Sequence, residues 1–275
     1  MSLKAGERVA FVQEGHVCTA VWPNVKRKVE IGQGQNIALS PDGKLVAYET
    51  NTTGGNGVFA VADAITGKVL RKHPGTHPTF SASGRFLAFT DFVKERWTAH
   101  LTDTATLKKT RSLESTGAMW VQDWAGEQVI ADSFNEPALC ALSTEGRLVK
   151  KFPYRQIFGK RTALLGRLVC SSDLNRLLYL NYTEEPLKSD PRSKVTGLFL
   201  LEFATGRLRP VSPAGLQVGG AGHHWYDRRS VTFLGIPNTK NILPASAYLL
   251  DLTTGKATKL MDDVTEFTVG YRDSG

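Results

Sequence analysis

The segment Gly219-Gly220-Ala221-Gly222-His223-His224-Trp225 holds the residue types with the greatest chemical potential in this chain of 275 residues. Glycines let a backbone approach a ligand closely, imidazoles can bind a metal ion or titrate near neutral pH, and an indole can stack on a sugar or a base. A structural role also fits the pattern, with the glycines forming a crossover between strands and Trp225 filling an interface between sheets. His223, His224 and Trp225 are therefore candidate ligand-binding residues, and both interpretations stay open.

Four more residues complete the candidate ligand-binding set, and they are His77, Arg161, Glu184 and Arg192. The last two belong to a long polar segment over residues 181–197, and a second long segment covers residues 235–246. Long connections on a rigid scaffold often carry binding function. Arginine suits an anionic ligand because its planar guanidinium can bind both oxygens of a carboxylate.

The sequence lacks the patterns of familiar catalytic motifs. Thr66-Gly67-Lys68 and Thr254-Gly255-Lys256 miss the upstream glycine and the following Ser or Thr of a phosphate-binding loop, and neither Gly-x-Ser-x-Gly nor His-Glu-x-x-His occurs. Cys18, Cys140 and Cys170 are odd in number and widely spaced, so they predict neither a disulfide framework nor a metal motif. We expect no catalytic residue, no metal and no cofactor.

A recurring short phrase indicates which elements position these residues. Its clearest copies are Ser40-Pro41-Asp42-Gly43-Lys44-Leu45-Val46-Ala47-Tyr48 and Ser81-Ala82-Ser83-Gly84-Arg85-Phe86-Leu87-Ala88-Phe89. Pro presets φ, Asp bonds back to the turn backbone and Gly accepts φ > 0, so the phrase predicts a β-hairpin. A second hairpin follows at Thr66-Gly67-Lys68, and its turn returns at Thr205-Gly206-Arg207. A strand-and-turn repeat of about 40–50 residues is the signature of a β-propeller.

The copies divide the chain into six expected blades, of which blades two to six cover residues 35–75, 77–115, 117–156, 163–213 and 221–263. The two ends complete the count, because residues 266–275 resemble a first strand without its partner and residues 6–11 resemble a second strand without its predecessor. The predicted fold is all-β, a single six-bladed β-propeller domain over residues 1–275 with four-stranded antiparallel blades. We expect the C-terminal strand to join the N-terminal blade and close the ring, since closure removes an open edge.

The net charge of +8 has two interpretations. Basic pairs such as Lys108-Lys109 and Lys150-Lys151 recur just after the second hairpin turn, on the expected outer strand of each blade. Lysine on an exposed edge guards against edge-to-edge aggregation, whereas an anionic partner at the rim would use the same charges. Only the net charge points to nucleic acid, and no motif supports that partner. The chain has no apolar run long enough for a transmembrane helix, and no signal peptide is visible before Lys4.

The phrase at residues 40–48 resembles the repeat of the TolB-like propeller family, and residues 81–89 repeat it without the Pro-Asp pair. The resemblance implies a six-bladed monomer that binds proteins in the bacterial cell envelope, periplasmic or extracellular, whereas free cysteines are equally compatible with the cytosol. The same repeat also builds the propeller of prolyl-oligopeptidase-type peptidases. Gly222-His223-His224-Trp225 is similar to a segment of oligogalacturonate lyases, which implies a histidine-bound metal for which His77, His223 and His224 are the candidate ligands.

These observations favour a non-enzymatic binding or scaffold propeller. We expect a protein or peptide partner at the channel mouth framed by blades five and six, where the first strand of each blade begins. The alternative is a carbohydrate-active or anionic-saccharide-binding propeller, in which Arg161 or Arg192 would grip a carboxylate.

Overall fold

The computed structural model describes residues 2–50, 57–113, 119–158, 165–181, 197–237 and 245–270. Within them, antiparallel strands form one seven-stranded sheet and four four-stranded sheets. The seven-stranded sheet has the order β23-β1-β2-β3-β4-β5-β6. Its strands are β1 (Arg8–Gln13), β2 (His16–Val21), β3 (Val29–Leu39), β4 (Leu45–Thr50), β5 (Val58–Asp63), β6 (Val69–Pro74) and β23 (Glu266–Val269).

Each four-stranded sheet follows chain order from one edge to the other. The first contains β7 (Thr76–Phe80), β8 (Phe86–Val93), β9 (Arg96–Asp103) and β10 (Lys108–Ser112). The second contains β11 (Met119–Ala125), β12 (Gln128–Ser133), β13 (Ala138–Leu142) and β14 (Leu148–Pro153), and the short helix α1 (Tyr154–Phe158) follows it. The third contains β15 (Leu165–Cys170), β16 (Arg176–Asn181), β17 (Gly197–Glu202) and β18 (Arg207–Pro210). The fourth contains β19 (Leu216–Asp227), β20 (Ser230–Pro237), β21 (Ala245–Asp251) and β22 (Ala257–Val264).

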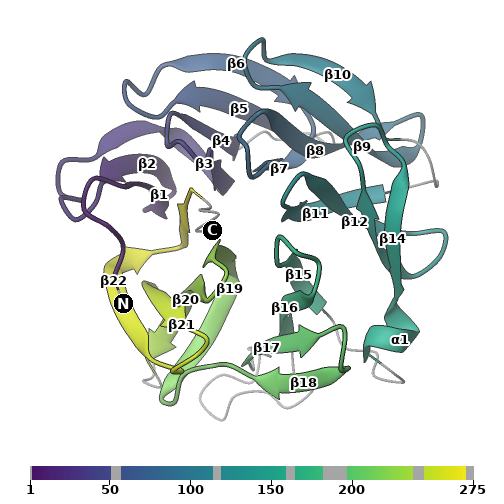
Figure 1. Ribbon diagram of the computed structural model, residues 1–275. Helices are drawn as coiled ribbons and strands as arrows, with labels where there is room; N and C mark the ends of the chain where they lie inside the picture. The colour runs from purple at the N-terminus through teal and green to yellow at the C-terminus, as the bar shows by residue number, and fades with distance from the viewer. Residues whose placement is uncertain are drawn as a thin grey trace.

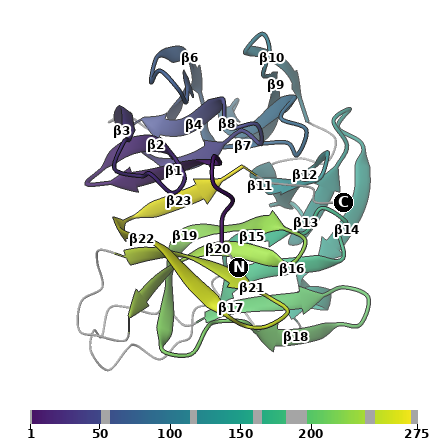
Figure 2. The same cartoon turned by 60° about the vertical axis from the view of Figure 1, so that its left-hand side comes forward.

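The sheets stand around a central axis in a propeller-like arrangement (Figure 1). Strands β3, β7, β11, β15, β19 and β23 lie nearest the axis, and β6, β10, β14, β18 and β22 lie toward the rim. Turned by 60°, the molecule shows β23 between β1 and the sheet of β19–β22 (Figure 2). The inner strands therefore bring residues from every sheet to one channel.

Strand β3 departs from the expectation of six separate four-stranded sheets. Residues 29–33 pair with β2, and residues 34–39 pair with β4, so one strand serves as the outer strand of one repeat and the inner strand of the next. The register shifts between Gln35 and Ala38, where Asn36 adopts a φ of 51°. This kink turns the strand without ending it, which explains why the first two repeats share one sheet.

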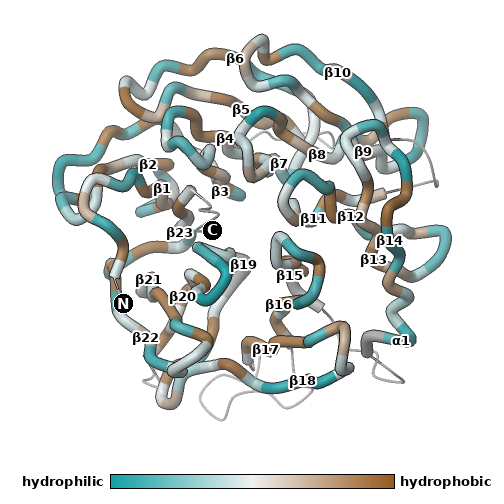
Figure 3. The backbone as a smooth tube through the Cα atoms, viewed as in Figure 1, coloured by the Kyte–Doolittle hydropathy of each residue, from teal (hydrophilic) through white to brown (hydrophobic). Residues whose placement is uncertain are grey.

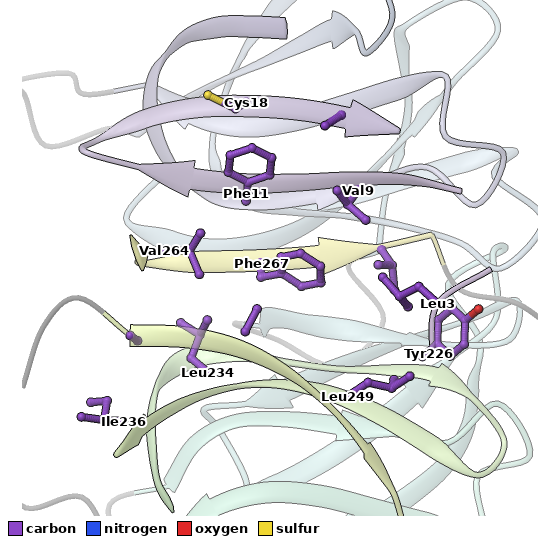
Figure 4. Close-up of a cluster of buried hydrophobic side chains, with 14 residues drawn as sticks. Leu3, Val9, Phe11, Cys18, Tyr226, Leu234, Ile236, Leu249, Val264 and Phe267 are labelled. Carbon is purple, nitrogen blue, oxygen red and sulfur yellow. The ribbon is translucent and has the colours of Figure 1, made fainter. Parts of the chain in front are cut away.

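The hydrophobic core consists of apolar clusters between successive groups of strands. Figure 4 shows one, in which Phe11 and Phe267 face Leu234 and Leu249 across the gap between β1–β23 and β20–β21. Both phenylalanines are fully buried, and burial of such a ring contributes about 2–3 kcal/mol of hydrophobic free energy. Strand β23 pairs antiparallel with β1, with Phe267 opposite Phe11.

The turn phrase forms the hairpin that its residues predict. Ser40 Oγ accepts from the Leu45 amide at 2.9 Å and donates to Asp42 Oδ1 at 2.7 Å, while Gly43 adopts a φ of 71°. The same serine-to-backbone bonds recur at Ser81 and Ser171. These turns fix where each inner strand ends and therefore where its side chains meet the channel.

The three cysteines are free and buried, and burial raises the pKa of each thiol. Among the described residues, no helix is both long and apolar enough to cross a membrane.

Candidate functional site

A chain of polar and aromatic contacts crosses the face of the molecule at which the inner strands begin. It joins β23, β3, β4, β7, β8, β9 and β11, so it spans three of the sheets. We call it the mouth row, and its members are Glu266, Asn36, Glu49, His77, Trp120, Trp97 and Phe92.

Carboxylates form the first half of the mouth row. The Asn36 amide donates to Glu266 Oε1 at 2.8 Å, and the next amide, of Ile37, donates to Glu266 Oε2 at 2.9 Å. The side-chain amide of Asn36 in turn donates to Glu49 Oε2 at 2.8 Å. Because these bonds satisfy the amides of the kink in β3, Glu266 stabilises the change of direction in that strand.

Glu49 makes the corresponding contact one sheet further on. The His77 amide donates to Glu49 Oε1 at 2.6 Å, and Thr76 Oγ1 donates to the same oxygen. His77 has a φ of 54°, a backbone conformation that is rare for a residue with a side chain. The imidazole Nδ1 also lies 3.4 Å from Glu49 Oε1, and the Glu49 side chain is only 13% exposed. The carboxylate therefore holds His77 in place from a largely buried position.

Aromatic rings form the second half of the mouth row. The His77 ring meets Trp120 edge-on at 4.6 Å, Trp120 meets Trp97 edge-on at 4.7 Å, and Trp97 meets Phe92 at 4.9 Å, all between ring centroids. Phe92 and Trp97 are register partners on either side of the β8–β9 turn. Phe92 is 40% exposed. Tilted and edge-to-face contacts are preferred geometries of aromatic pairs, so the rings stabilise one another, and Trp97 and Trp120 are half-buried.

The described members of the predicted site lie on two strands, with His77 on β7 and His223, His224 and Trp225 on β19. His77 lies in the mouth row, on the sector of β7 and β11 and away from the sheets that we expected to frame the mouth. Arg161, Glu184 and Arg192 lie outside the described residues. His223 is buried at 1% exposure, and His224 is half-buried in the wall of the channel.

Trp225 packs inside the fold. Its Nε1 donates to the Val169 carbonyl of β15 at 3.1 Å, its side chain belongs to the cluster between the last two sheets, and the Arg176 guanidinium lies 4.9 Å from its ring. Trp124 makes the equivalent bond, from Nε1 to the Thr79 carbonyl of β7 at 2.8 Å. These contacts agree with the structural interpretation, in which Trp225 fills an interface between sheets.

The channel has a small cavity at its other end, beside the turns that follow the inner strands. The cavity holds about 60 Å³, and its wall includes Thr79, Asp123, Ser172, His224 and Thr268. That volume suits a few water molecules and is far below the roughly 300–1,000 Å³ of a typical small-molecule site.

The metal-site alternative finds no support in the described parts of the chain. No three His, Cys, Asp or Glu side chains gather there in a way that could hold a metal ion. His223 and His224 are neighbours in β19, whereas His77 belongs to β7 and contacts Glu49 and Trp120.

The candidate set contained only His77 of the mouth row, and it missed Glu49, Phe92, Trp97 and Trp120. One signal was available, because Phe92 and Trp97 flank Lys94-Glu95 symmetrically and so lie opposite one another in a hairpin. The role of Glu49 had no local signal, since its partners at positions 36 and 77 are set by the packing of separate sheets.

No protein-family model matches the chain, and no curated protein matches it. Among solved structures, TolB from Acinetobacter baumannii aligns with a TM-score of 0.67 at 14% identity, over 97% of this chain and 67% of that one. A chain of the nidogen/laminin complex aligns at 0.58 and 12% identity, over 98% and 100%. The β-propeller domain of the Trilobed protease from Pyrococcus furiosus aligns at 0.55 and 13% identity, over 94% and 96%. These likenesses show the fold alone, and that fold is a TolB-like β-propeller.

Proposed function

We propose that this chain is a non-enzymatic scaffold propeller that binds a protein or peptide through the mouth row. The single observation that carries the proposal is a run of partly exposed aromatic rings in mutual contact, anchored at its His77 end by the largely buried carboxylate of Glu49. Large rigid rings contribute much of the affinity of protein interfaces, since they bury apolar area and lose little conformational entropy.

The contacts of the mouth row favour the binding of a protein over catalysis. Both carboxylates accept hydrogen bonds from backbone amides, so their charge stabilises the scaffold. The rings stand on strand ends of rigid sheets, which is where propellers and other scaffolds present contact residues. The proposal places the binding face at β7, β8, β9 and β11, in place of the sector between blades five and six.

A closed ring would supply the rigidity that such a face needs. We infer that the seven-stranded sheet is two blades joined through β3, and that β23 completes the first of them, which gives six blades in all. The pairing of β23 with β1 and the six clusters between successive groups of strands support this count. The resemblance to TolB-like repeats supports a place in the bacterial envelope, which fractionation of the native host would test.

A peptide library displayed on phage and selected on the immobilised protein tests the mouth row directly. Enriched peptides should bind Phe92→Ala and Trp97→Ala at least about tenfold more weakly than the wild type, because hot-spot rings contribute about 1–4 kcal/mol each. Ile65→Ala is the matched control, since Ile65 is 54% exposed and lies at the turn after β5, on the opposite face. A library that yields no binder, or binders that tolerate both mouth-row variants, would contradict the proposal.

A further inference from the structure

The rim of the molecule carries a groove that is separate from the mouth row. It lies between β14, the outer strand of its sheet, and the end of β17 in the next sheet, and it encloses about 390 Å³. Its walls include Lys150, Phe152, Gln156, Leu201 and Phe203. We call it the rim groove.

The apolar floor of the rim groove is a stacked pair of rings. Phe152 and Phe203 come from different sheets, and their centroids are 4.1 Å apart at an interplanar angle of 17°. Phe152 is 7% exposed and packs into the core, whereas Phe203 is half-buried at the groove. The floor is therefore anchored in the core by Phe152, and the exposed part of Phe203 is an apolar surface that a ligand side chain could cover.

Positive charge lies directly over this floor. Lys150 Nζ is 4.8 Å from the centroid of Phe152 and 5.9 Å from that of Phe203. The neighbouring Lys151 pairs with Glu136, but no carboxylate among the described residues forms an ion pair with Lys150. Arg147 and Arg155, both exposed, flank the strand. An acidic ligand would therefore find an available ammonium group beside an apolar surface.

Within the part of the chain that the structure describes, β14 is an edge strand of its sheet, beside this charge. It pairs with β13 on one side, and residues 148–151 are all exposed. Leu148 is 44% and Val149 is 51% exposed, which is unusual for an edge that should avoid association. A second cavity of about 300 Å³ lies on the other face of the same strand and contacts Leu148, Lys151 and Glu136. Since successive side chains of a strand point to opposite faces, an added strand would reach both cavities.

Strand β6 offers a natural comparison. Its sequence, VLRKHP, matches the LVKKFP of β14 in type at each position, and both strands bulge after their first residue. In both strands a hydrophobic stretch is followed by a hydrophilic one (Figure 3). At β6, however, the ring position is the buried His73, and the ring contributed by the next sheet is the fully buried Phe89. The two edges therefore share charge and shape, but only β14 has a half-exposed ring beside it.

We propose that the rim groove binds an extended acidic peptide, which adds as a strand to the free edge of β14. One of its apolar side chains lies on the Phe152–Phe203 pair, and a carboxylate pairs with Lys150. The edge supplies main-chain hydrogen bonds, and the groove supplies the preference for acidic over basic sequence. This site is independent of the mouth row and does not require it.

The test uses fluorescent synthetic peptides in anisotropy titrations against the full chain. The probe is Thr-Glu-Val-Phe-Val-Glu-Thr, in which each Glu is two positions from the Phe and so shares its face, as Lys150 shares the face of Phe152. Its controls replace every Glu by Lys or the central Phe by Pro, which lacks the amide hydrogen that a strand donates. We expect binding of the first peptide alone. Lys150→Glu should weaken it about tenfold or more and Lys150→Gln by less, while Phe203→Ala removes the apolar contact and weakens it as well.

The matched control is Arg71→Glu/Lys72→Glu on β6, which changes the charge of an equivalent edge that lacks the groove. Binding should stay within about twofold of the wild type. Hydrogen exchange should slow in β14 on peptide addition, and not in β6 or around Phe92 and Trp97. No binding of the acidic peptide, equal loss in the β6 control, or protection at the mouth row in place of β14 would each overturn the proposal.

Discussion

At the scale of single residues, two tryptophans show how a side chain can hold neighbouring sheets together. Trp124 and Trp225 occupy inner strands, and each donates its indole N–H to a backbone carbonyl of the preceding inner strand. A buried carbonyl that loses its donor costs about 1–3 kcal/mol. The same contact occurs at both tryptophans. Trp225 therefore has a structural role, although the sequence of its segment also suggested ligand binding.

We predict that Trp225→Phe lowers the free energy of unfolding by roughly 1–3 kcal/mol, because the Val169 carbonyl loses its partner. Urea denaturation followed by circular dichroism measures the loss. Trp124→Phe should behave alike, and neither substitution should change peptide binding at the mouth row. A Trp225→Phe protein that is fully stable but loses a ligand would restore the binding interpretation.

The buried His100 is a second residue with a measurable consequence. Burial first, and then the charge of Lys109, lower its pKa from 6.5 to about 4, while Asp91 and a hydrogen bond involving the Arg111 backbone act in the opposite direction. The ring lies tilted against Phe89, with 5.4 Å between the ring centroids. Because the folded-state pKa lies below the unfolded value, the unfolded chain takes up a proton first as the pH falls. Stability is therefore complete above pH 6.5 and declines toward pH 4.

We predict a loss of about 2 kcal/mol in the free energy of unfolding between pH 8 and pH 5 from this group. His100→Gln should flatten that part of the pH profile, which denaturant titrations at several pH values would record. His73, whose pKa is also lowered by burial, should add to the same slope. Ile65→Ala is the control, since Ile65 is exposed and carries no titratable group, so the profile between pH 8 and pH 5 should stay steep. An unchanged slope in His100→Gln would show that the ring is accessible to protons in the folded state.

At the scale of elements, the lysines of the outer strands have two roles that the sequence does not distinguish: protection of an exposed edge, and compensation of a buried carboxylate. Lys108 is an exposed edge residue, whereas Lys109 Nζ lies 4.0 Å from the carboxylate of Asp91, a residue only 7% exposed. Replacing Lys109 by an acidic residue would leave the negative charge of the buried Asp91 carboxylate without a neighbouring positive charge.

We predict that Lys108→Glu changes stability by less than about 0.5 kcal/mol, whereas Lys109→Glu costs roughly 1–3 kcal/mol. Paired thermal melts of the two variants provide the comparison. Both proteins should remain soluble, because either charge protects an edge. Equal stability of the two variants would mean that Lys109 also acts only as an edge guard.

The hairpins could be predicted from the sequence because their signals are local. Ser40, Asp42 and Gly43 each act on a backbone atom within five residues, so spacing alone identifies the turn. The continuity of β3 could not be predicted in this way, since its kink depends on Glu266, which lies 230 positions from Asn36. The mouth row could not be predicted for the same reason, because its residues come from separate sheets and meet only when those sheets pack together.

At the scale of the whole molecule, the two ends of the described chain meet at one seam. Strand β23 lies between β1 and the sheet of β19–β22, and Phe267 packs there against Phe11. On the same side, Tyr226 Oη donates its proton to the Glu7 carboxylate, whose two oxygens lie 2.8 and 2.9 Å away. The residues in these contacts are more than 200 positions apart in the sequence, so a local sequence pattern could not have predicted that they meet.

If this seam closes the ring, weakening it should open the molecule there first. Phe267→Ala removes a fully buried ring and should cost about 3–5 kcal/mol, and deletion from Glu266 onward should cause aggregation or a large fall in melting temperature. Hydrogen exchange of Phe267→Ala should accelerate in β1, β22 and β23 well before β11–β13, because local opening exposes only the strands at the seam. Phe80→Ala in β7 is the control, since it weakens a cluster away from the seam and should leave β1 and β23 protected. Exchange that rises equally in all strands of Phe267→Ala, or a truncated protein that melts unchanged, would show that β23 adds a strand without closing the ring.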